Sequence, residues 1–101
     1  MKSSPTNLDV DAIRTLDDLR GFIHTVLCDR ENILAEQFAL REIPLKRGGQ
    51  SCGLEFRLHG PRSIRLGAIW NTDHNTVYFY DTRGDRFLKL TLKQRLVLAA
   101  A

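Results

Sequence analysis

The last sixty residues of this chain alternate between apolar and polar side chains with a period of two. In the first run, Cys52, Leu54, Phe56 and Leu58 are apolar. Successive side chains on a strand point to opposite faces, so this period predicts strands with one apolar face. The pattern recurs toward the C-terminus over residues 64–70, 77–79 and 88–92. We therefore expect a sheet that buries one of its faces.

Turn-forming residues separate these runs. Gly60-Pro61, residues 71–75 and Arg83-Gly84-Asp85 each lie between two alternating segments. Short connections of this kind are typical of an antiparallel meander. A further strand precedes them, and its Pro44 cannot donate to a ladder, which indicates an edge position. The expected strands are 38–47, 51–59, 63–70, 76–81 and 86–92.

A helix is predicted before the sheet, over residues 16–28. Thr15 is a suitable N-cap, and two aspartates follow in the first turn, where the helix dipole favours anions. Gly21 lies inside the helix at a cost of about 1 kcal/mol relative to alanine, and we expect it to permit a close approach to the sheet. The apolar stripe of the helix should cover the apolar face of the sheet. The predicted core is Leu19, Ile23, Val26, Leu54, Phe56, Leu66, Trp70, Phe79 and Leu90.

Matching of the apolar faces also predicts the register, because a one-residue slip would turn each apolar set outward. The expected cross-strand pairs are Leu58 with Ile64, Trp70 with Val77, and Phe79 with Leu88. The fold class is α+β: one N-terminal helix packed on a five-stranded antiparallel meander, either open or curled into a small barrel.

The length of 101 residues predicts a single domain, 1–101, with a flexible arm at 1–8 and a frayed or vector-derived tail at 98–101. No apolar run approaches the roughly 20 residues of a membrane span, and no apolar stretch follows the first residues as in a signal peptide. With Cys28 and Cys52 as its cysteines, we expect a cytoplasmic protein with unpaired thiols.

Charge divides unevenly along the chain. Residues 1–37 hold four basic and seven acidic residues, whereas residues 38–101 hold eleven basic and five acidic ones. An acidic helical segment beside a basic sheet indicates either internal complementarity or an anionic partner for the sheet. Basic residues on sheet edges that prevent edge-to-edge pairing are a simpler explanation.

The polar face of the predicted sheet carries aromatic and basic residues together. In the expected register Arg57 lies opposite Arg65, which is unfavourable unless an anion sits between them. Three interpretations stay open: a stacking and phosphate-binding platform for single-stranded nucleic acid, a patch that binds a protein or a second copy, or cross-strand fillers beside Gly67. The candidate binding residues are Arg57, Arg62, Arg65, Tyr78, Tyr80, Phe87 and Lys89.

Candidate chemistry elsewhere is weak. His24 and Cys28 have a helical spacing that can chelate a metal, and Cys52 with His59 would complete a tetrahedral site. These pairs lack the tight spacing of zinc motifs, and nothing selects a Cys–His catalytic pair. We therefore expect no catalytic residue, no metal and no cofactor.

Two stretches of the chain, residues 28–32 (CDREN) and residues 48–62 (GGQSCG to LHGPR), resemble a set of small uncharacterised bacterial proteins of similar length. That resemblance implies no activity, cofactor or partner. The order of one helix followed by five bent strands is similar to that of Sm-like and other SH3-like barrels. The Sm glycine and asparagine motifs are absent, so ring assembly and RNA binding do not carry over.

The sequence favours a small non-enzymatic binding or interaction module that acts through a protein partner or self-association. Single-stranded nucleic-acid binding by the basic, aromatic sheet face is the alternative, and a small metal protein or enzyme is the remaining one. Salt dependence of binding separates the nucleic-acid interpretation from the others.

Overall fold

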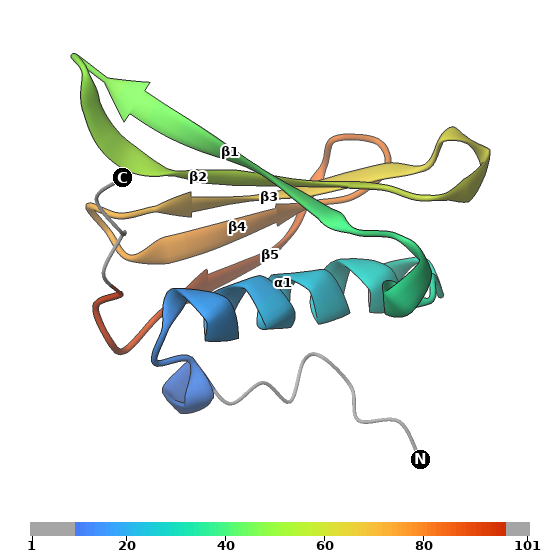
Figure 1. Ribbon diagram of the computed structural model, residues 1–101, viewed down its shortest axis with the longest axis horizontal. Coiled ribbons are helices and arrows are strands. Elements are labelled where there is room, and N and C mark those ends of the chain that lie inside the picture. The colour runs from blue at the N-terminus through green and yellow to red at the C-terminus, as the bar shows by residue number, and fades with distance from the viewer. Residues whose placement is uncertain (1–9, 97–101) are drawn as a thin grey trace.

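The computed structural model describes residues 10–96, which form one helix followed by five strands (Figure 1). The strands pair antiparallel in the order β1-β2-β3-β4-β5, and the sheet is open rather than closed into a barrel. The α+β prediction is confirmed, whereas the predicted arm at 1–8 and tail at 98–101 lie outside the described residues. The elements are α1 (Leu16–Arg30), β1 (Leu40–Arg47), β2 (Gln50–His59), β3 (Arg65–Asn71), β4 (Thr76–Tyr80) and β5 (Arg86–Thr91).

Helix α1 begins as the sequence predicts. The hydroxyl of Thr15 accepts a hydrogen bond from the backbone N–H of Asp18 at 3.0 Å, and the Asp18 carboxylate accepts one from the N–H of Thr15 at 3.2 Å. This capping box satisfies two backbone donors that the first turn would leave unpaired. The helix continues to Arg30, two residues beyond the expected end, and a short 3-10 turn at Ala35–Gln37 follows it.

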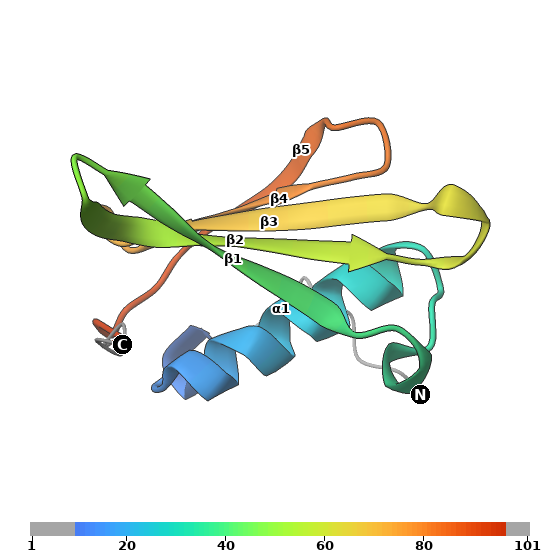
Figure 2. The same ribbon diagram turned by 45° about the horizontal axis from the view of Figure 1, so that its top comes forward.

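The helix covers one face of the sheet, and Figure 2 shows the two layers from the side. We call the covered side the inner face and the opposite side the outer face, over which no described helix lies. All predicted core residues are buried except Leu90, which is half-buried. The largest fully buried side chains are Trp70, Phe56, Phe79, Leu19, Ile23, Leu27, Leu58 and Val77.

The predicted register is correct for β3–β4 and for most of β4–β5, but it is wrong by two residues for β2–β3. Leu58 lies opposite Leu66 rather than Ile64. The connection is longer than expected, because residues 60–64 form a closed loop in which Gly60 N–H donates to the Ile64 carbonyl at 2.8 Å. A shift of two residues preserves the facing of every side chain. The apolar set therefore stays inside, although its partners change.

Asn75 joins the β3–β4 turn to the end of the sheet. This residue is buried and has a left-handed backbone, with φ of 51°. Its side-chain oxygen accepts the indole N–H of Trp70 at 3.2 Å, and its amide donates to the carbonyls of Leu92 and Gln94 at 3.3 and 2.9 Å. The indole N–H of Trp70 thereby has a hydrogen-bond partner inside the core. The same side chain holds the segment after β5 against the β3–β4 turn.

Gly53 in β2 and Gly21 in α1 differ in the space that surrounds their Cα atoms. A Cβ added at Gly53 would collide with the carbonyl oxygen of Trp70 in the neighbouring strand, so this position requires glycine. Gly21 in α1 is exposed, and an added Cβ would meet nothing within 4 Å. The expectation that Gly21 permits close helix–sheet approach is therefore wrong, because Gly21 lies on the solvent side of the helix.

The first prediction concerns the fully buried Phe56. Phe56→Ala should lower the free energy of unfolding by about 3 to 5 kcal/mol, since it removes a large side chain between the helix and the sheet and leaves a cavity. Urea denaturation measures the change, with Thr25→Ala on the exposed side of α1 as the control, expected within about 0.5 kcal/mol of wild type. A loss below about 1 kcal/mol for Phe56→Ala would contradict the inner-face assignment.

The second prediction contrasts the two glycines. Gly21→Ala should raise the free energy of unfolding by about 0.5 to 1 kcal/mol, because alanine reduces the entropy lost in the helix and meets open space. Gly53→Ala should lower it, since the backbone of β2 or β3 has to move away. Urea midpoints of the two single variants measure both effects, and equal shifts would show that the local surroundings do not matter.

Candidate functional site

The outer face is organised by rows of residues that lie opposite each other across the five strands. One row runs Arg41–Arg57–Gly67–Tyr80–Arg86 from β1 to β5, and we call it the arginine row. Three of its five positions are arginines, and its centre has no side chain. Cross-strand neighbours on one face lie about 4.5–5.5 Å apart at Cβ, so these side chains share one surface.

Arg86 occupies the place on the outer face that the sequence assigns to Phe87. A bulge after Phe79 pairs Tyr80 with Arg86 and leaves Phe87 without an opposite residue. The Phe87 ring lies 6.1 Å from that of Phe79 in the core, and the guanidinium of Arg30 lies 4.4 Å from its centroid. The assignment of Phe87 to the aromatic outer surface is therefore wrong, because the bulge reverses the alternation at this residue.

The next row across the sheet is mixed in character. It runs Ile43–Glu55–Ile69–Tyr78–Lys89, and its apolar members are half-buried. The guanidinium of Arg86, from the arginine row, lies 4.3 Å from the centroid of the Tyr78 ring, and Lys89 lies 5.9 Å from it. Cation–π contacts therefore already occupy the Tyr78 ring. A planar ligand that stacks there would have to displace Arg86.

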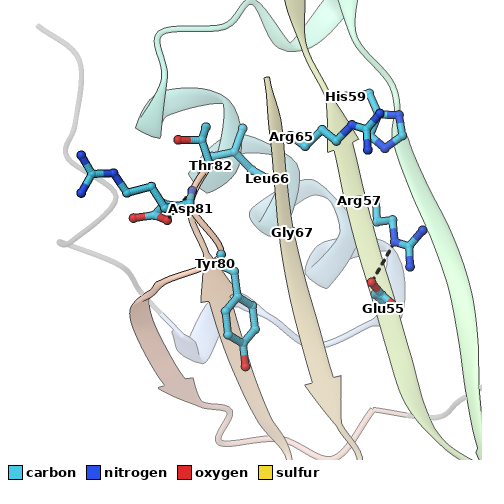
Figure 3. Close-up of a pocket in the computed structure, with 11 residues that line it drawn as sticks. Glu55, Arg57, His59, Arg65, Leu66, Gly67, Tyr80, Asp81 and Thr82 are labelled. Atoms are coloured by element: carbon cyan, nitrogen blue, oxygen red, sulfur yellow. Dashed lines mark hydrogen bonds and ion pairs between the residues drawn. The ribbon is translucent and has the colours of Figure 1, made fainter. Parts of the chain in front are cut away.

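A hollow of about 410 Å³ opens on the outer face where the arginine row passes Gly67 (Figure 3). On one side it is lined from β2 and β3 by Glu55, Arg57, His59, Arg65 and Leu66, while Tyr80 lines the other side. In Figure 3, Gly67 lies on the strand between the arginine side and Tyr80. The hollow exists because Gly67 places no side chain between two large neighbours. The β4–β5 hairpin completes the lining with Asp81, Thr82, Arg83 and Gly84.

The cations of this face are only partly neutralised. The Arg57 guanidinium donates to the Glu55 carboxylate at 2.8 Å, whereas the Arg65 side chain has no hydrogen-bond or ion-pair partner among the described residues. Arg41 lies directly opposite Arg57, and Arg65 directly opposite His59. Like charges opposite each other destabilise a sheet. The expected Arg57–Arg65 pair is replaced by Arg41–Arg57, in which Glu55 neutralises Arg57 but no described carboxylate pairs with Arg41.

Asp81 does not supply the missing negative charge. Its carboxylate accepts hydrogen bonds from the backbone N–H groups of Arg83 and Asp85 at 2.9 and 3.0 Å, which shapes the hairpin. Its other oxygen lies 3.8 Å from Arg30 at the end of α1. This carboxylate therefore holds the rim of the hollow in place and is already engaged there.

The predicted site residues divide into three groups. Arg57, Arg65 and Tyr80 line the hollow, and Tyr78 with Lys89 lies beside it on the same face. Arg62 lies outside the lining, in the exposed turn Pro61–Ser63, and Phe87 faces inward. Sequence reasoning missed four residues at this end of the face. They are Arg41, His59, Arg83 and Arg86. The alternating pattern places His59 on this face, but the sequence analysis does not assign it to the site.

The candidate metal ligands are not brought together. The ring of His24 forms a hydrogen bond of 2.6 Å between Nε2 and the carbonyl oxygen of Phe38. Cys28 is buried in the core, and Cys52 is half-buried at the bulge where β2 pairs with β1. Within residues 10–96, no three His, Cys, Asp or Glu side chains are grouped so as to hold a metal ion.

No protein-family model, no curated protein and no solved structure matches this chain. The resemblance to small bacterial proteins therefore stays a prediction. Among the described residues, no helix is both long and apolar enough to cross a membrane. The candidate site accordingly rests on its own chemistry: a hollow with arginines on one side and a tyrosine on the other.

The third prediction concerns the two thiols. Burial raises the pKa of the Cys28 thiol, and the neighbouring charges of Asp29 and Glu36 raise it further, so little thiolate forms at neutral pH. A disulfide reagent should therefore modify half-buried Cys52 first and Cys28 only slowly. Labelling followed by peptide mass analysis measures this, with urea-unfolded protein as the control in which both thiols react. Fast modification of Cys28 in folded Cys52→Ser would contradict the prediction.

Proposed function

We propose that this protein is a binding module rather than an enzyme, and that it holds an anionic partner on the outer face of its sheet. The observation that carries the proposal is the concentration of positive charge around the hollow, with Arg65 unpartnered and Arg41 directly opposite Arg57. An anion placed between these groups would relieve their repulsion. The two nearby carboxylates, Glu55 and Asp81, already form ion pairs with arginines. Such paired carboxylates are poorly suited to act as a general acid or base.

Pairing with the acidic helix does not account for these cations. The acidic helix packs against the inner face, so its carboxylates are separated from the outer face by the sheet itself (Figure 2). The ion pairs that α1 does form with the sheet side involve Arg20 with Glu42 at 2.7 Å and Arg30 with Asp81 at 3.8 Å. Neither pair neutralises an arginine of the arginine row.

Self-association through the outer face is the less favourable form of an interaction module. Two copies that met face to face would bring one arginine row against another, since a twofold interface uses the same surface twice. A partner of opposite charge avoids this repulsion. We propose that the protein acts in the cytoplasm, where its two free thiols would stay reduced.

The fourth prediction tests charge at the hollow. Arg65→Glu should weaken binding of a fluorescent polyanion at least tenfold, because it replaces the unpartnered cation by a like charge. The matched control is Arg14→Glu, an equal charge change at an exposed residue before α1. Fluorescence anisotropy at low and high salt, with a mixed-sequence 12-nucleotide single strand and a 12-residue glutamate-rich peptide as probes, measures the affinities.

Binding of either probe that weakens with salt and with Arg65→Glu, but not with Arg14→Glu, supports the proposal. Two results would overturn it. One is the absence of binding to both probes at low salt, and the other is an equal loss in the two variants, which would mean that only net charge matters.

A further inference from the structure

The size of the hollow exceeds what a small anion alone would occupy. A volume of about 410 Å³ lies within the range of sites that hold small organic ligands, roughly 300–1,000 Å³. Its two sides differ in chemistry, since Arg57 and Arg65 line one, together with Glu55, and Tyr80 lines the other. A ligand that fits both sides carries an anionic group at one end and a planar, stackable group at the other.

The arginine side suits a phosphate group. The Arg57–Glu55 bond at 2.8 Å uses the Nε of Arg57 and orients its guanidinium beside the hollow, and Arg65 is free to bind. Guanidinium groups bind phosphate oxygens through paired N–H donors. His59, opposite Arg65, adds a ring nitrogen on the same side (Figure 3).

The tyrosine side suits an unpaired base. Tyr80 is half-buried and lines the hollow, and it lies across from Gly67, which leaves the space beside its ring open. Arg86 lies 5.8 Å from the Tyr80 centroid and donates to the Tyr80 hydroxyl at 3.4 Å, whereas it lies 4.3 Å from the Tyr78 centroid. Lys89 also contacts the Tyr78 ring, so Tyr80 is the less covered of the two rings and the better stacking partner for a base.

Among the described residues, the outer face carries no large hydrophobic side chain that is fully exposed, and its Ile43 and Ile69 are half-buried. Protein interfaces are centred on apolar and aromatic side chains that become buried on binding. Among the described residues, the one large exposed hydrophobic side chain is Leu34, which precedes the 3-10 turn at Ala35–Gln37 and lies outside the sheet. Nucleic-acid interfaces are more polar and far more positive, which matches the arginine row and the lining of the hollow.

We infer that the anionic partner is a single strand of nucleic acid, with a phosphate between Arg57 and Arg65 and one base stacked on Tyr80. This inference rests on the proposed function and adds the class of partner to it. Stacking on Tyr80 requires an unpaired base, so a duplex of the same sequence should bind more weakly. The phosphate contacts should weaken as salt concentration rises, whereas base stacking should not, so the two contributions to affinity can be measured separately.

The test uses fluorescence anisotropy with 12-nucleotide single strands of DNA and RNA, the matching duplex and the glutamate-rich peptide. Tyr80→Leu should weaken single-strand binding by about 5- to 100-fold and leave the salt slope unchanged, because it removes stacking alone. Arg65→Gln should reduce the slope of log K against log salt by about 0.7, the value for one phosphate contact on a single strand. Tyr80→Phe keeps the aromatic ring, so it is the matched control and should retain binding.

The outcomes distinguish this inference from the proposed function. Binding of the peptide but not of the single strands overturns the inference and leaves the proposed function standing, whereas binding of neither overturns both. Equal affinity for duplex and single strand, or an equal loss in Tyr80→Phe and Tyr80→Leu, overturns the inference. Thermal midpoints of all variants establish folding, and if Tyr80→Leu does not fold, Arg65→Gln and the duplex comparison still decide.

Discussion

The burial of the Trp70 indole in the core is the constraint on which the rest of the fold depends. Its N–H must be paired inside the core, and Asn75 accepts it at 3.2 Å while holding the chain after β5 through two further hydrogen bonds. Asn75 tolerates the left-handed backbone of the β3–β4 turn better than most residues. Asn75 thereby stabilises the β3–β4 turn, pairs the buried indole N–H, and holds the chain after β5 in place.

Because the inner face takes the large apolar residues, the outer face is left to polar and charged ones. Strand alternation then places Arg57, Gly67 and Tyr80 in one row, and the absence of a side chain at Gly67 opens the hollow. The same geometry sets cations opposite each other, at some cost in stability. An anion bound there, as we propose, would offset this repulsion.

The bulge after Phe79 links the core to the outer face. It turns Phe87 inward, where its ring contacts Phe79 and receives Arg30 from the end of α1. It also brings Arg86 onto the outer face, over Tyr78. One irregular residue thus strengthens helix–sheet packing and changes the outer surface from aromatic to basic. Only one of the three aromatic residues expected there, Tyr80, then borders the hollow.

The sequence by itself determined the elements and the facing of most side chains. The period-two runs place Phe56, Trp70 and Phe79 inside, and Thr15 marks the start of the helix, because alternation and capping are local properties of the chain. Arg57, Arg65 and Tyr80 could be placed on the outer face for the same reason.

The tertiary structure alone decided the register of β2 with β3, the facing of Phe87 and the open form of the sheet. Each depends on hydrogen bonds and packing contacts that the alternating pattern does not encode: the closed loop between Gly60 and Ile64, the contact of Phe87 with Phe79, and the cover that α1 provides. The hollow and the arginine row are products of that register. Alternation excludes a one-residue slip, but it cannot distinguish registers that differ by two residues.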